Sequence, residues 1–170
     1  MSEHLNVGGF RYRFRLLNED DTIADEFEAD NLVPQDGLTH LLLAPFGDSA
    51  PISTFYCGLW RANVLPTSSL KATDIPSNLQ EFVGYSEATR PEWNRQHNGT
   101  GTLDNSASVA EFSFTADATL YGSLLVSSPT KGGNSGLLLS CVRFPSPRPV
   151  VAGQKGQLIA GITYVPTNVI

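Results

Sequence analysis

The sequence predicts an all-β fold, a β-sandwich or jelly-roll-like domain, and three features of its composition favour this class. Only 16% of the 170 residues are charged, against about 25% in an average soluble protein. Glycine and proline contribute 15 and 11 residues, which suits many short strands joined by turns. Apolar residues make up 41% of the chain, enough for one hydrophobic core at this length. We therefore expect a single domain over 1–170, with an N-terminal hairpin arm at 1–30 and a core at 31–170.

Residues 9–30 carry the period-2 pattern of a β-hairpin. Three arginines alternate with apolar residues, a polar turn follows at 18–21, and three carboxylates then alternate with Phe27 and Ala29. A turn centred between Asp20 and Asp21 places every arginine opposite a carboxylate, in the pairs Arg15–Glu26, Arg13–Glu28 and Arg11–Asp30. The same register places Phe14 beside Phe27 on the other face. One register that satisfies both faces indicates a hairpin with a solvated, internally neutralised face.

The remaining elements follow from changes in period along the chain. Pro34 and the leucines at 38, 41 and 42 indicate a short helix near 34–44, with His40 on its other side. An Asp before Ile75-Pro76 indicates one helical turn, and the prolines at 145, 147 and 149 indicate an extended stretch. Runs of apolar and aromatic residues predict further strands at 53–60, 107–115, 120–126, 136–144 and 157–165. The total is seven or eight strands and one helix.

Charge and hydropathy exclude several classes of function. The net charge of −6 and the isoelectric point near 4.9 argue against nucleic-acid binding, which usually needs a basic patch. No apolar run reaches the 18 residues of a membrane span. The N-terminus lacks the basic-then-apolar pattern of a signal peptide. We expect Cys57 and Cys141 to be reduced and unbridged, as in proteins that assemble in the cytoplasm.

No set of residues predicts catalysis. The segment 133–136 (GNSG) is similar to the nucleophile segment of trypsin-like proteases, but that mechanism needs a histidine base oriented by an aspartate. His4 lies near the terminus, His40 on the short helix and His97 in a glycine-rich loop, and none has the expected context. The carboxylates near 19–26 lack the spacing of a calcium loop. We therefore expect no enzymatic activity, no cofactor and no bound metal.

Three segments, which we call the signature segments, resemble a recurrent pattern in small structural proteins of tailed bacteriophages. The first is residues 82–93 (FVGYSEATRPEW), preceded by the strand 56–60 (YCGLW). The second is 128–136 (SPTKGGNSG), which runs into a leucine-rich strand, and the third is 147–154 (PRPVVAGQ). The resemblance covers about residues 31–165. The charged hairpin at 9–30 departs from it and is interpreted as this protein's own attachment device.

The resemblance implies a virion protein, most simply a capsid decoration or cement protein on the outer surface of the shell. It implies assembly in the host cytoplasm, a homotrimer, and the major capsid protein as partner, with neither nucleic acid nor membrane bound. Two alternatives stay open: a tail fibre or baseplate component that binds a receptor, with Trp60 or Trp93 stacking on sugars, and a lectin-like module of the host. The expected interface residues lie in the hairpin turn and in the loop 84–101: Glu19, Asp20, Asp21, Tyr85, Glu87, Arg90 and Trp93. Large aromatic residues of the signature are also expected to close one end of the core.

Overall fold

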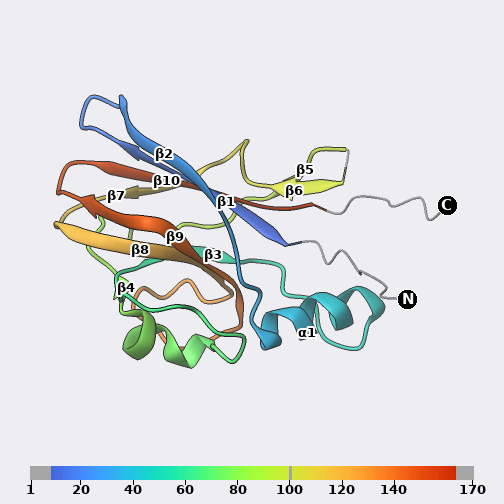
Figure 1. Ribbon diagram of the computed structural model, residues 1–170. Coiled ribbons are helices and arrows are strands. Elements are labelled where there is room, and N and C mark those ends of the chain that lie inside the picture. Colours follow the sequence, from blue (N-terminus) through green and yellow to red (C-terminus); the bar gives the residue numbers. More distant parts are fainter. Residues whose placement is uncertain (1–8, 100, 164–170) are drawn as a thin grey trace, which may run out of the picture.

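The protein consists of two antiparallel β-sheets packed face to face in a computed structural model that describes residues 9–99 and 101–163 (Figure 1). Sheet A runs in the order β2-β1-β10-β6-β5, and β7 also pairs with β10. Sheet B runs in the order β4-β3-β8-β9. The strands of sheet A are β1 (Phe10–Leu17), β2 (Ile23–Asp30), β5 (Gln96–His97), β6 (Thr102–Asp104), β7 (Ala110–Ser113) and β10 (Lys155–Thr163). The strands of sheet B are β3 (Tyr56–Trp60), β4 (Glu81–Phe82), β8 (Ala118–Val126) and β9 (Leu138–Val150). The sandwich that the sequence predicts is confirmed.

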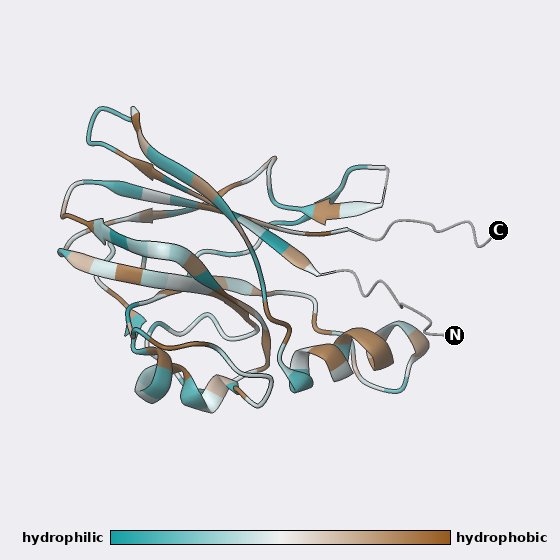
Figure 2. Ribbon diagram, viewed as in Figure 1, coloured by the Kyte–Doolittle hydropathy of each residue, from teal (hydrophilic) through white to brown (hydrophobic). Residues whose placement is uncertain are grey.

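The hairpin β1–β2 has the predicted register. The opposed pairs are Arg11–Asp30, Arg13–Glu28 and Arg15–Glu26. All three pairs form ion pairs on the solvent face, and charged and apolar side chains alternate along both strands (Figure 2). On the inner face, the rings of Phe14 and Phe27 lie 5.8 Å apart. Opposite-charge pairs on one face and an aromatic pair on the other both favour this register.

The hairpin is part of the sandwich, so the expectation of an arm at 1–30 is wrong for the described residues 9–30. Strand β1 pairs along its whole length with β10, from Phe10 opposite Ile162 to Leu17 opposite Lys155. The side chains of Phe10, Tyr12 and Phe14 are at most 2% exposed and belong to the main core. The alternating apolar residues of β1 therefore make it an inner strand of sheet A, with β2 as the edge.

Sheet B is buried on both of its faces. One face packs against sheet A and forms the main core, which contains Cys57 and Leu125. The other face packs under the helical turns η2 (Ala72–Asp74) and η3 (Ile75–Leu79) and forms a second core around Trp60. A strand that is buried on both faces carries an almost continuous apolar run instead of an alternating one. This explains the dense apolar sequence of β3, β8 and the first half of β9.

The two cysteines are free and buried, as predicted. Strand β8 lies between β3 and β9, so Cys57 and Cys141 are two strand spacings apart, about 9–10 Å. The Cα atoms of a disulfide are rarely more than about 6.8 Å apart. The two side chains also point into different cores on opposite faces of sheet B. Burial raises the pKa of the Cys141 thiol to about 12 and also raises that of Cys57.

The predicted helix is present as α1 (Gln35–Leu43), continued by the turn η1 (Ala44–Phe46). It approaches β9 at Gly37, where a Cβ atom would lie 2.3 Å from the carbonyl oxygen of Leu139. Because the helix is docked through this glycine, the leucine pattern is a poor guide to its buried side. Leu42 is 57% exposed, whereas His40 lines two pockets beside the helix.

Other elements differ from the sequence prediction in extent. The described residues form ten strands, because β4, β5 and β6 have two or three residues each and carry no readable period. Strand β9 continues through all three prolines to Val150. It lies at the edge of sheet B, where proline is tolerated because one side of the strand needs no donors. Strand β10 ends at Thr163, and the predicted extension to 165 lies outside the described residues.

Candidate functional site

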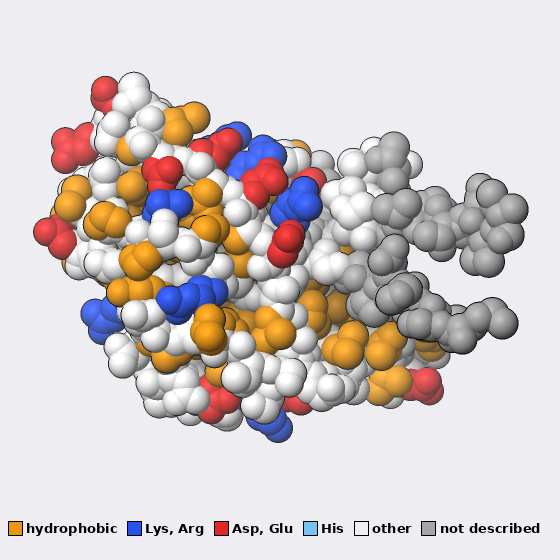
Figure 3. All heavy atoms as spheres, viewed as in Figure 1, with side chains coloured by type: hydrophobic (Ala, Val, Ile, Leu, Met, Phe, Trp, Pro, Cys, Tyr) orange, Lys and Arg blue, Asp and Glu red, His pale blue; other side chains and the backbone are white. Residues whose placement is uncertain are grey.

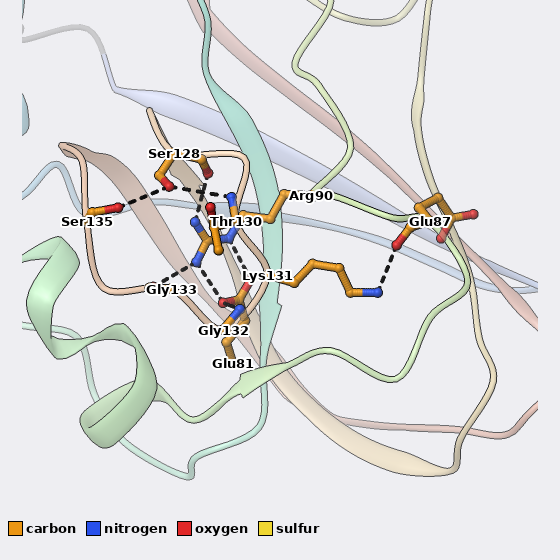
Figure 4. A network of polar contacts seen from close by, with 9 residues as sticks. All are labelled: Glu81, Glu87, Arg90, Ser128, Thr130, Lys131, Gly132, Gly133 and Ser135. Carbon is orange, nitrogen blue, oxygen red and sulfur yellow. Dashed lines mark hydrogen bonds and ion pairs between the residues drawn. The ribbon is translucent and has the colours of Figure 1, made fainter.

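The signature segments meet at a buried ion pair between Glu81 and Arg90 (Figure 4). The guanidinium of Arg90 donates from Nε to Glu81 Oε1 and from Nη2 to Oε2, both at 2.7 Å. The side chains of Arg90 and Glu81 are 0% and 1% exposed. Bidentate pairing of this kind satisfies both the planar guanidinium and the carboxylate. The pair therefore carries two charges in the interior without an unpaired charge.

The same arginine holds the loop 127–136 in place. Arg90 Nη1 donates to the carbonyl oxygen of Ser128 at 2.8 Å, and Nη2 donates to that of Gly133 at 3.0 Å. The backbone N–H of Gly132 donates to Glu81 Oε2 at 2.7 Å. Gly132 has a φ of 68°, a left-handed conformation that favours glycine. The glycine at position 132 is thus explained by the backbone path around this ion pair.

A lysine from the same loop closes the other side of the network. Lys131 Nζ donates to the carbonyl oxygens of Tyr85 and Glu87 at 2.7 and 2.8 Å. It also lies 4.0 Å from the centroid of the Tyr85 ring, a favourable cation–π distance. Figure 4 shows Arg90 and Lys131 reaching in opposite directions between the two loops. Together they join the segments 81–90 and 128–133 into one unit.

The structure corrects the expected role of three signature residues. Tyr85 and Trp93 are each 3% exposed and Arg90 is 0% exposed, so none of the three offers a contact surface in the single chain. Trp93 donates its Nε1 hydrogen to the carbonyl oxygen of Ala160 at 2.8 Å. Arg90 pairs with Glu81 and not with Glu87 or Glu92, the partners nearest in the signature. Phe82, Tyr85 and Trp93 are each 3% exposed and belong to the main core.

The other expected interface residues are at least partly exposed. Glu19, Asp20 and Asp21 lie at the exposed tip of the hairpin β1–β2. The Asp20 carboxylate accepts hydrogen bonds from the backbone and hydroxyl of Thr22, and the hydroxyl bond, followed by the backbone bond, lowers the pKa of Asp20. Asp21 pairs with Lys155 at 2.8 Å. Glu87, partly exposed, accepts hydrogen bonds from a backbone N–H of β7. Three of these four carboxylates therefore have partners within the chain.

Sequence reasoning missed an exposed apolar surface on α1 and η1. Leu42, Leu43 and Phe46 are 57%, 37% and 81% exposed; we call them the α1–η1 ridge. Figure 3 shows hydrophobic side chains gathered over α1. Beside the ridge lies a pocket of about 290 Å³, which we call the groove. Among the residues that line the groove are Phe10, Leu41, Pro45, Ile52, Phe55 and Ile162.

The segment 133–136 belongs to the irregular connection between β8 and β9 and ends in a bend at Gly136. The Ser135 hydroxyl donates to that of Ser128 at 3.3 Å. Within residues 9–99 and 101–163, no three or more His, Cys, Asp or Glu side chains are grouped so that they could hold a metal ion. None of the helices formed by these residues is long and apolar enough to cross a membrane.

No protein-family model matches this chain, and a search of curated proteins returns no significant match.

Proposed function

We propose that this protein is a structural protein of a tailed-phage virion, a decoration protein that binds and stabilises the capsid shell. One observation carries the proposal: the buried ion pair between Glu81 and Arg90 joins the first two signature segments through hydrogen bonds to the loop 128–133. In this arrangement the residues that resemble the phage proteins stabilise the fold itself. Recognition is then left to the exposed surfaces, as suits a family with a common scaffold and varied attachment sites.

The exposed surfaces suit a macromolecular partner. The α1–η1 ridge presents three large apolar side chains to solvent, and clustered exposed apolar residues mark interaction sites more often than isolated ones. The net charge of −6 opposes binding to the phosphates of nucleic acid or to anionic lipid. The partners of the proposal are accordingly the major capsid protein and further copies of this chain.

The mechanism is thermodynamic. A protein that binds only the assembled shell stabilises that shell by mass action, to an extent that grows with occupancy and affinity. A homotrimer engages several shell subunits at once, so each contact can be modest while the combined affinity is high. Assembly in the host cytoplasm, followed by binding to the outer surface of the capsid, completes the proposal.

The carbohydrate-binding alternative loses its structural support. That interpretation relies on Trp60 or Trp93 stacking on a sugar, but their exposed fractions are 0% and 3%. Both indole N–H groups donate to backbone carbonyl oxygens, of Ser123 and Ala160 respectively. A ring whose faces are packed in a core has no free face for a pyranose.

The test compares phage particles that lack this protein with complete particles. We expect the deficient capsids to assemble, to adsorb to host cells normally and to lose infectivity faster on heating. Adding the purified protein back should restore heat survival, and density for it should appear on the capsid in electron microscopy. Equal heat survival together with failed adsorption would overturn the proposal in favour of a tail component.

A further inference from the structure

The α1–η1 ridge and the groove lie side by side on one chain and are of opposite shape. Phe46 of the ridge follows directly after Ala44 and Pro45, which line the groove. Phe46 is 81% exposed. It is the last residue of η1, which ends at Gly47 with a φ of 83°. The chain therefore carries a projecting aromatic residue at the rim of an apolar cavity.

We propose that Phe46 of one copy inserts into the groove of a neighbouring copy and that this contact holds the oligomer together. The dimensions fit, because an apolar cavity of about 150 Å³ accommodates benzene and the groove measures about 290 Å³. Its lining from Phe10, Leu41 and Phe55 is apolar. In a closed ring, each copy gives its ridge to one neighbour and its groove to the other, so that every ridge and every groove is occupied.

Charge complementarity supports a second copy as the occupant. Asp48 is exposed two residues after Phe46, and among the described residues its carboxylate has no ion-pair partner. The groove wall contains Arg95, whose guanidinium lies 5.1 Å from the centroid of the Trp93 ring. Insertion of Phe46 would bring the Asp48 carboxylate of the same copy to the wall that carries Arg95. The proposed contact therefore combines a buried aromatic side chain, Phe46, with a pair of opposite charges, Asp48 and Arg95, at the edge of the groove. Buried aromatic residues are common hot spots of interfaces.

The experiment measures the mass of the purified full-length chain by light scattering and sedimentation over a range of concentrations. We expect the wild type to be an oligomer and Phe46→Ser to raise its dissociation constant about 30-fold or more. The matched control is Leu65→Ser, because Leu65 is similarly exposed at 77% but belongs neither to the ridge nor to the lining of the groove. It should leave the mass unchanged.

A charge exchange tests the direction of the contact. Asp48→Arg and Arg95→Glu should each weaken the oligomer, and the double variant should recover most of the loss. Circular dichroism of each variant confirms that the fold is kept. A monomeric wild type, or an oligomer that is insensitive to Phe46→Ser, would overturn the inference. The result is independent of the proposed function, since an oligomer built through Phe46 that fails to bind capsids would refute the decoration role alone.

Discussion

Replacement of Arg90 by methionine tests whether the buried ion pair holds the signature loops together. The substitution removes the cation and leaves the Glu81 carboxylate, 1% exposed, without an opposite charge. It also removes the donors to the carbonyl oxygens of Ser128 and Gly133. Breaking a buried pair from one side typically costs about 3–5 kcal/mol. In a domain of this size each 1 kcal/mol lowers Tm by roughly 2–4 °C, so we expect Tm to fall by about 6–20 °C.

Two further variants make the result specific to burial. Arg13→Met breaks the ion pair with Glu28, whose partners are both 42% exposed, and should cost only about 0–1 kcal/mol. The double variant Glu81→Met with Arg90→Met removes both charges, and we expect it to be more stable than Arg90→Met alone. Stability is measured by urea and thermal unfolding, followed by circular dichroism. If Arg90→Met and Arg13→Met lose equal stability, the ion pair does not have the structural role assigned to it.

Three other predictions concern packing, thiols and charge. Gly37→Ala should destabilise the fold by about 1–3 kcal/mol, since its Cβ would meet a backbone oxygen of β9; unchanged urea unfolding would show that α1 can shift outward. Cys57 and Cys141 are both 0% exposed, so a thiol reagent should detect two thiols per chain only after denaturation; reaction in the native state would contradict their burial. The hydrogen bond from Arg13 lowers the pKa of Glu28, so its stabilising effect is present above the ordinary glutamate pKa and is lost as pH falls through the lowered value. NMR titration should show that pKa rising in Arg13→Met, and an unchanged value would refute the pairing.

The hairpin was predictable because its information is local. Its two strands are neighbours in sequence, and only one register pairs all three arginines while also placing Phe14 beside Phe27. A slip of one residue would place the charged side chains on the core face. Both strands lie within the 22 residues 9–30. Their pairing can therefore be predicted without knowledge of the rest of the fold.

The ion pair at Arg90 was not predictable in the same way. Glu87 and Glu92 are nearer in sequence, but the chain turns at Gln80, whose φ is 53°, and places Glu81 on the short strand β4. The available signal was a glutamate directly before Phe82 and Val83, because a charged residue in a buried strand needs a buried partner. The side of α1 that packs was predicted only in part: Leu41 packs against the main core, whereas Leu42 is exposed, because Gly37 sets the approach to β9.

Two residues of this protein lie where their type is uncommon: Arg90 is fully buried, and Phe46 is highly exposed. A fully buried arginine and a highly exposed phenylalanine are each uncommon, and such exceptions carry more information than a normal core. Arg90 is explained within the chain, since Glu81 and two loop carbonyl oxygens receive its hydrogen bonds. Phe46 is not explained within the described chain, where it is 81% exposed. In the proposed oligomer Phe46 is buried in the groove of an identical chain, which has a suitable size and an apolar lining. The ion pair holds the loops of each copy in place, and in the proposed oligomer the ridge determines how the copies assemble.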